Sequence, residues 1–132
     1  MNSAVKYLSQ CNIFYLATVE DNQPRIRPFG AIAELYGKPY LCTNNLKNVY
    51  RQLLANPNIQ LCGMNEDGTW VRVTAKAVPD HRPEAKVAFL EACPGVKQLY
   101  QPTDITFEVL CLEDVITEHA SFGKNGYLFT RV

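Results

Sequence analysis

The sequence predicts a mainly β protein, an antiparallel β-barrel of about six to seven strands with three short peripheral helices. Strand-like alternation of apolar residues recurs along the chain, and Asp-Gly and Asn-Gly pairs mark tight hairpins. The connections between strands are also too short for parallel crossovers. A β-sandwich would satisfy the same observations, but we favour the barrel because closure removes exposed strand edges. At 132 residues, we expect one domain spanning residues 1–132.

Three strands and two helices are expected in the first half of the chain. Asn2 or Ser3 can cap a short first helix. The strands are expected at residues 13–19, 24–35 and 39–43. Apolar residues between Leu46 and Leu54 then follow the spacing of an amphipathic helix, which Pro57 stops.

Four further strands and a third helix are expected in the second half. The strands are expected at residues 59–64, 70–78, 105–112 and 127–132, with 115–117 continuing the third of them past a bend. Pro83 suits the first position of a helix, which Pro94 and Gly95 break. Residues 94–104 are expected to be irregular. They could form a lid over a ligand or, equally, a plain connection packed on the barrel.

Composition excludes several classes of function. The 13 basic and 13 acidic residues balance, which argues against a nucleic-acid binder. No apolar run approaches the roughly 20 residues of a membrane-spanning helix, and residues 1–10 lack a signal-peptide pattern. Five cysteines without a C-x-x-C pair indicate reduced thiols and a cytoplasmic protein. His81 and His119 lack metal-ligand spacing, so we expect no metal site.

The segment around residues 23–30 predicts an anion site. Arg25 and Arg27 lie two residues apart on a strand, so their side chains point to the same face and form a cationic clamp. The alternative is an ordinary solvated strand face. Lys47 adds a third positive charge near the start of a predicted helix, whose free N–H groups also favour anions. We expect this helix to be capped by Thr43, Asn44 and Asn45.

Several short motifs occur in a characteristic order. They are residues 14–19, 24–30, 40–44 with Lys47, 54–57 and 70–73, followed by 94–100 and 105–112. Together they resemble the pyridoxamine 5'-phosphate oxidase-like family of FMN-binding split barrels, and the last two resemble its small nitroimidazole-resistance-like or flavin-reductase-like members. The resemblance covers nearly the whole chain. The histidine and arginine pattern near the C-terminus of true pyridoxamine-phosphate oxidases has no counterpart here, so that activity is not expected.

The resemblance implies a split barrel and a homodimer with FMN at the subunit interface. The phosphate would be held by Arg25, Arg27 and Lys47. The isoalloxazine ring would lie against Pro28, Phe29, Gly30, Cys42, Thr43 and Asn44. A proline without an N–H and a glycine without a side chain both suit a place where a flat ligand approaches the backbone. Trp70 could contact the ring or instead pack in the barrel core or dimer interface.

The expected function is that of an FMN-dependent oxidoreductase. Electrons would pass from a reduced donor such as NAD(P)H to a small organic acceptor or oxygen. No side chain can be assigned as a general acid or base, and Cys42 reads as a buried filler rather than a nucleophile. The alternatives are a non-catalytic flavin-binding, storage or redox-sensing protein, or a split barrel that uses F420 or haem.

Overall fold

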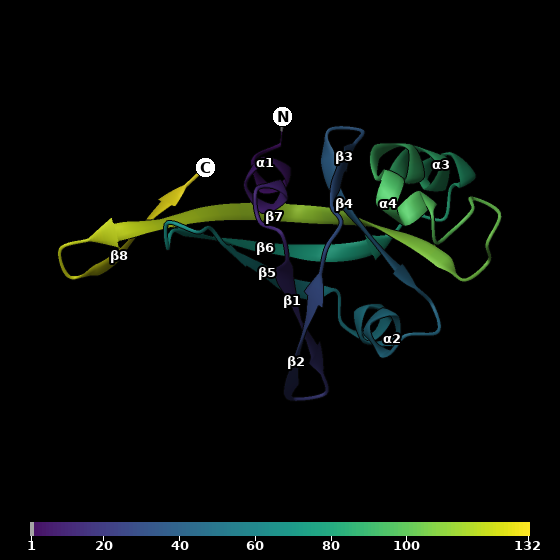
Figure 1. Cartoon of the computed structure of the whole chain (residues 1–132). Helices are drawn as coiled ribbons and strands as arrows, with labels where there is room; N and C mark the ends of the chain where they lie inside the picture. Colours follow the sequence, from purple (N-terminus) through teal and green to yellow (C-terminus); the bar gives the residue numbers. More distant parts are fainter. Residues whose placement is uncertain (1) are drawn as a thin grey trace.

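The eight strands of the computed structural model, which describes residues 2–132, form one antiparallel sheet (Figure 1). Along the sheet the strand order is β2-β1-β5-β6-β7-β4-β3, and β8 pairs with β7. The strands are β1 (Phe14–Glu20), β2 (Gln23–Phe29), β3 (Ala33–Leu35), β4 (Lys38–Asn44), β5 (Asn58–Met64), β6 (Trp70–Pro79), β7 (Phe107–Gly123) and β8 (Gly126–Arg131). The predicted mainly β, antiparallel split-barrel class is therefore confirmed.

Helices surround the sheet. They are α1 (Ser3–Ser9), α2 (Asn48–Ala55), α3 (Pro83–Ala92) and α4 (Pro94–Lys97). Helix α1 lies near β5, β6 and β7, α2 packs mainly on β1, and α3 lies beside β3 and β7 with α4 next to it (Figure 1). The side chain of Asn2 caps α1, as expected, by accepting from the N–H groups of Ala4 and Val5. Within residues 2–132, no helix has the length and apolar character needed to span a bilayer.

The core follows from strand alternation. In β5 every second residue is buried, and the same alternation in β6 sends Val71 and Val73 inward. These side chains join Leu16 and Leu110 in the main cluster inside the barrel. A second cluster lies beneath α3, around Phe89. Each large apolar side chain fully buried in these clusters contributes about 1.5–3 kcal/mol.

A bend in β7 allows this long strand to pair with three other strands. Asp114 has φ 52°, and the pairing of β6 with β7 shifts register between Thr74 and Lys76. Beyond β6, the first part of β7 pairs with β4 and its last part pairs with β8. The expected bend before residues 115–117 is therefore confirmed, although the strand continues to Gly123.

Two expectations about element boundaries are wrong. Residues 24–35 form two strands, because the chain leaves its partner β1 after Phe29 and joins β4 from Ala33. The intervening residues 30–32 connect β2, the first strand in the sheet order, to β3, the last. Residues 94–97 are not irregular but form the fourth helix, where Pro94 occupies a first-turn position that suits its fixed φ.

The β7–β8 hairpin projects beyond the body of the barrel, in yellow in Figure 1. All six residues of β8 are exposed. Trp70 packs edge-on against Tyr127 and Phe129 of this hairpin, with centroid separations of 5.7 and 5.4 Å. Its ring therefore supports the hairpin on the outer side of the sheet and does not line the cleft described below.

Candidate functional site

A cleft of about 650 Å³ is enclosed by α1, the end of β2, β4, and α4 with the residues that follow it. Its volume is within the usual range for small-molecule sites. Six of the nine predicted site residues line it: Pro28, Phe29, Gly30, Cys42, Thr43 and Lys47. Pro28 and Phe29 belong to β2, and Cys42 and Thr43 belong to β4, whereas Gly30 directly follows β2 and Lys47 directly precedes α2. β2 and β4 are not neighbours in the sheet order, yet both line the cleft.

Asn44 lies next to the cleft. Its Oδ1 accepts a hydrogen bond from the Leu46 N–H at 2.9 Å, which directs the amide nitrogen the other way. That Nδ2 donates to the hydroxyl of Tyr100, a cleft residue, at 3.3 Å. Asn44 is thus connected to the cleft through Tyr100.

The two predicted phosphate-binding arginines lie outside the cleft lining. Arg25 forms an ion pair with Glu20 at 3.1 Å, and half of its side chain is exposed. Arg27 faces the side of β2 that α2 covers. Its guanidinium donates to Thr18 Oγ1 at 2.8 Å, to the carbonyl oxygen of Leu16 at 3.3 Å and to Gln52 Oε1 at 2.5 Å.

The environment of Arg27 favours a bound anion. All three of its acceptors are uncharged oxygens, and it forms no ion pair with the residues that the structure describes. Burial lowers the pKa of Arg27, the charge of Arg25 lowers it further, and Glu20 partly offsets both effects. A phosphate bound beside the two guanidinium groups would therefore relieve both repulsion and incomplete pairing.

The start of α2 differs from the expected capping arrangement. Lys47 is the N-cap residue and makes no side-chain cap bond, so capping by Thr43, Asn44 and Asn45 is wrong. Asn45 instead donates to the carbonyl oxygen of Ile105 at 2.8 Å and to Glu108 Oε1 at 3.1 Å. The reason is tertiary, because β7 and the residues just before it offer Asn45 acceptors that the local sequence does not reveal. The first N–H groups of α2 thus remain without a side-chain acceptor from the N-cap residue.

Two features of the cleft wall fit a flat polar ligand. The hydroxyl of Thr43 is buried yet has no hydrogen-bond partner among the described residues, and such orphaned groups are costly unless a ligand or water satisfies them. At Gly30, a Cβ added to the backbone would meet no atom within 4 Å, so space is open beside this residue. Within the described residues, Lys47 is the only charged residue that lines the cleft.

The thiols in the cleft are poor nucleophiles. Burial raises the pKa of Cys42 to about 12, with a further increase from Cys93 and an opposing effect of Lys47. Burial also raises the pKa of Cys93. The third thiol of the lining, Cys11, also has its pKa raised by burial. All three groups are therefore neutral near pH 7, which agrees with the interpretation of Cys42 as a buried filler.

Cleft residues between 93 and 100 were not among the predicted site residues. Cys93, Pro94, Gly95, Val96, Leu99 and Tyr100 all contribute to the wall. The only sequence signal was the possibility of a lid over residues 94–104, which did not single out Tyr100. Its proximity to Asn44 depends on how α4 packs and so could not be derived from spacing along the chain.

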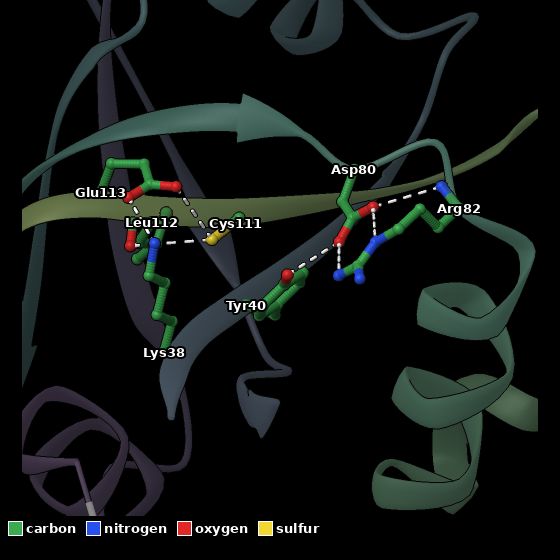
Figure 2. Close-up of polar contacts among 7 residues, drawn as sticks. All are labelled: Lys38, Tyr40, Asp80, Arg82, Cys111, Leu112 and Glu113. Atoms are coloured by element: carbon green, nitrogen blue, oxygen red, sulfur yellow. Dashed lines mark hydrogen bonds and ion pairs between the residues drawn. The ribbon is translucent and has the colours of Figure 1, made fainter. Parts of the chain in front are cut away.

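A second polar cluster lies at the opposite end of β4 (Figure 2). Asp80 accepts a hydrogen bond from the Tyr40 hydroxyl at 2.8 Å and two from the Arg82 guanidinium at 3.0 and 2.8 Å. Nearby, Lys38 pairs with Glu113 at 2.7 Å. These side chains satisfy one another's hydrogen-bonding and charge requirements. We therefore interpret the cluster as a structural connection between β4 and the corner that leads into α3.

The two histidines have partners away from the cleft. His81 is largely exposed, with Nδ1 3.6 Å from Glu108 Oε2, and the His119 ring lies 5.1 Å from the ring of Tyr7. Neither lines the cleft. Among residues 2–132 there is no group of three or more His, Cys, Asp or Glu side chains arranged to hold a metal ion.

Comparisons with known proteins identify relatives over most of the chain. The family model described as pyridoxamine 5'-phosphate oxidase matches residues 2–113. A nimC/nimA family protein from Clostridium acetobutylicum is 38% identical, with a TM-score of 0.90 over 98% of this chain and 90% of its own. The comparison with curated proteins gives no match.

Two more distant crystal structures share the fold. A pyridoxamine 5'-phosphate oxidase-related, FMN-binding protein from Nostoc punctiforme has 14% identity and a TM-score of 0.71, over 98% of this chain and 93% of its own. A haem-binding protein from Mycobacterium smegmatis has 21% identity and a TM-score of 0.74, over 97% of this chain and 56% of its own. At these identities the likeness concerns the fold alone.

Proposed function

Because the chain belongs to the pyridoxamine 5'-phosphate oxidase family, we propose that it is an FMN-binding flavoprotein acting as an oxidoreductase. The observation that carries this proposal is the buried, unpartnered hydroxyl of Thr43 in a cleft whose one charged lining residue, within the described chain, is Lys47. The open space beside Gly30 adds room for a planar ring. The FMN-binding relative with the same fold supports the choice of cofactor.

The strand residues would hold the ring, and the cations would hold the phosphate. In this arrangement the ring lies against Pro28, Phe29, Gly30, Cys42, Thr43 and Asn44. The hydroxyl of Thr43 would gain its missing hydrogen bond from the polar edge of the ring. Lys47 and the uncapped start of α2 favour a phosphate, and Arg27 reaches α2 through Gln52.

The cofactor would supply the redox chemistry, accepting hydride from a donor such as NAD(P)H and passing electrons to a small organic acceptor or oxygen. The chain's own residues would bind and orient it. Cys42 stays protonated near neutral pH and therefore does not serve as a base. The apolar side chains of Phe29, Val96 and Leu99 would limit the access of water to the ring.

We propose further that two copies of the chain associate. β2 lies at one end of the sheet path, and the outward side of β2, β1 and β5 carries Ile26, Tyr15 and Met64, which are 70%, 48% and 61% exposed. Such adjacent apolar groups suit burial against a second copy, which would also cover the exposed side of the flavin site. Analytical ultracentrifugation should give a dimer, and Ile26→Asp should shift it toward monomer. A monomeric wild-type protein would refute this part.

The test of flavin binding compares FMN with riboflavin, which lacks the phosphate. The Arg25→Ala/Arg27→Ala variant should bind FMN about 10- to 100-fold more weakly, with riboflavin affected less than about threefold. The matched control, Lys124→Ala/Arg131→Ala, removes the same charge on the β7–β8 hairpin and should leave both affinities unchanged. Equal losses for the two ligands would contradict the clamp. A colourless wild-type protein that binds no added FMN would refute the whole proposal.

The same spectra separate the alternatives. A storage or sensing protein would bind FMN but show no reduction of the flavin by NADH or NADPH without oxygen. Haem or F420 would each give its own absorbance spectrum in the purified protein. The positions of His81 and His119 outside the cleft argue against haem ligation there.

A further inference from the structure

Tyr100 is positioned at the wall of the cleft by a ring contact and a backbone hydrogen bond. Its ring stacks on that of Phe107, which is fully buried, with the centroids 4.9 Å apart and an interplanar angle of 29°. Its backbone N–H donates to the carbonyl oxygen of Val96 at 3.1 Å, which ties it to α4. Two independent contacts therefore fix where its hydroxyl lies.

The hydrogen-bonding of this hydroxyl leaves its proton unused. The Tyr100 oxygen accepts from Asn44 Nδ2 at 3.3 Å, and the Asn44 amide is oriented by its own bond from the Leu46 N–H. A phenolic hydroxyl carries one donor besides its acceptor sites. Within residues 2–132 no acceptor takes this proton, so the group can donate to a ligand.

The surroundings of Tyr100 define the chemistry of such a ligand. Its neighbours on this wall are Val96, Leu99 and the neutral thiol of Cys93, and 76% of Leu99 is exposed. An uncharged ring could cover the exposed part of Leu99 and gain apolar burial. A carbonyl-type oxygen on that ring would accept from Tyr100. A charged group would lose hydration here without an opposite charge on this wall.

We propose that the wall formed by Val96, Leu99 and Tyr100 is a subsite for a neutral ring compound bearing a carbonyl-type acceptor, to which Tyr100 donates a hydrogen bond. This subsite rests on the proposed function in one respect, since FMN would occupy the strand side of the same cleft. The α4 segment then serves as a specificity-determining wall and not as a plain connection.

The test uses two matched probes, 1-indanone and indane, which share a bicyclic ring and differ in the carbonyl group. Binding to the FMN-loaded protein is measured by calorimetry and by ligand-observed NMR. Tyr100→Phe should weaken 1-indanone binding about 2- to 10-fold, the range for one hydrogen bond, and leave indane within about twofold. Leu99→Ala should weaken both probes together.

A tyrosine away from the cleft serves as the control. Tyr127→Phe removes a hydroxyl on the hairpin and should change neither affinity. The subsite is refuted if Tyr100→Phe affects both probes equally or neither, or if 1-indanone does not bind. Flavin binding is measured separately by absorbance. If the protein takes up no FMN, the cofactor assignment fails. The same probes are then measured on the cofactor-free protein, and their binding decides whether the subsite exists.

Discussion

Asp80→Ala tests whether the cluster in Figure 2 fastens β4 to the rest of the barrel. Asp80 is the shared acceptor, because it takes hydrogen bonds from Tyr40 and from Arg82. Tyr40 is only 3% exposed, so its hydroxyl has little access to water as a substitute partner. Removing the carboxylate therefore leaves a buried donor unsatisfied.

The expected loss follows from that hydroxyl. A buried hydrogen bond to a charged group is worth about 1.5–3 kcal/mol, so Asp80→Ala should lower the free energy of unfolding by about 2–3 kcal/mol. Losing the hydrogen bonds from Arg82 contributes less to this decrease in stability, since half of the Arg82 side chain is exposed and solvent screens its charge. Tyr40→Phe removes the same hydrogen bond and should cost about 1.5–2 kcal/mol, because the Asp80 carboxylate keeps its two bonds from Arg82. In the double variant no unsatisfied hydroxyl remains. Its loss of stability should therefore be smaller than the sum of the two single losses, by a coupling energy of about 1–2 kcal/mol.

The assay is urea denaturation followed by circular dichroism and by fluorescence of Trp70, with both probes required to agree. Lys38→Ala is the control in the same region, because it breaks the exposed ion pair with Glu113 and should have little effect. A loss below about 1 kcal/mol for Asp80→Ala, or full additivity with Tyr40→Phe, would show that the cluster does not act as described.

The difference in unfolding free energy between wild type and Asp80→Ala should depend on pH. The Arg82 side chain holds the pKa of the Asp80 carboxyl well below its usual range, and the hydrogen bond from Tyr40 lowers it further. The unfolded carboxyl has a pKa of about 3.9, so this stabilisation is present above pH ~4 and is lost as the pH falls toward the folded pKa. The difference in unfolding free energy between wild type and Asp80→Ala should be constant from about pH 7 to 5 and should shrink below about 4. A constant difference down to about pH 2 would contradict this assignment.

Alkaline pH, thiol reagents and one glycine substitution test other parts of the molecule. Burial raises the pKa of Tyr40, and it raises the pKa of Cys42 to about 12, so the folded chain keeps protons that the unfolded chain loses. The free energy of unfolding should thus fall above about pH 9, by up to about 1.4 kcal/mol per pH unit for Cys42, and an unchanged value at about pH 10.5 would argue against this. In the Ile26→Asp variant, which leaves the proposed dimer face open, the exposed Cys62 should react with Ellman's reagent at least about tenfold faster than Cys42, as measured by mass mapping; similar rates would mean that the cleft opens readily. Gly63→Ala places a Cβ 2.7 Å from the sulfur of Cys11 and should cost about 1–3 kcal/mol, measured by urea denaturation. Cys11→Ala in the same chain should restore part of that loss, and full additivity would exclude the clash.

The local parts of this fold were predictable because short-range signals specify them. Asp-Gly and Asn-Gly pairs place the turns before β6 and β8, and Gly68 and Gly126 do have positive φ. Alternation in β6 predicted its buried face. By contrast, the caps expected from Thr43, Asn44 and Asn45 were wrong, since Ile105 and Glu108 supply competing partners that lie some 60 residues away in the chain.

The sequence by itself determined the strand pattern, the mainly β class and the residue types that could bind an anionic flavin, because these depend on alternation, turn propensity and charge along the chain. Only the tertiary structure decided which of them meet. It joined Gly30, Thr43 and Lys47 in one cleft, left Arg25 and Arg27 outside its lining, and brought Tyr100 to Asn44. The physical reason is that β2 and β4 occupy separate places in the sheet order, so their distance in space is set by closure of the sheet and by the packing of α4.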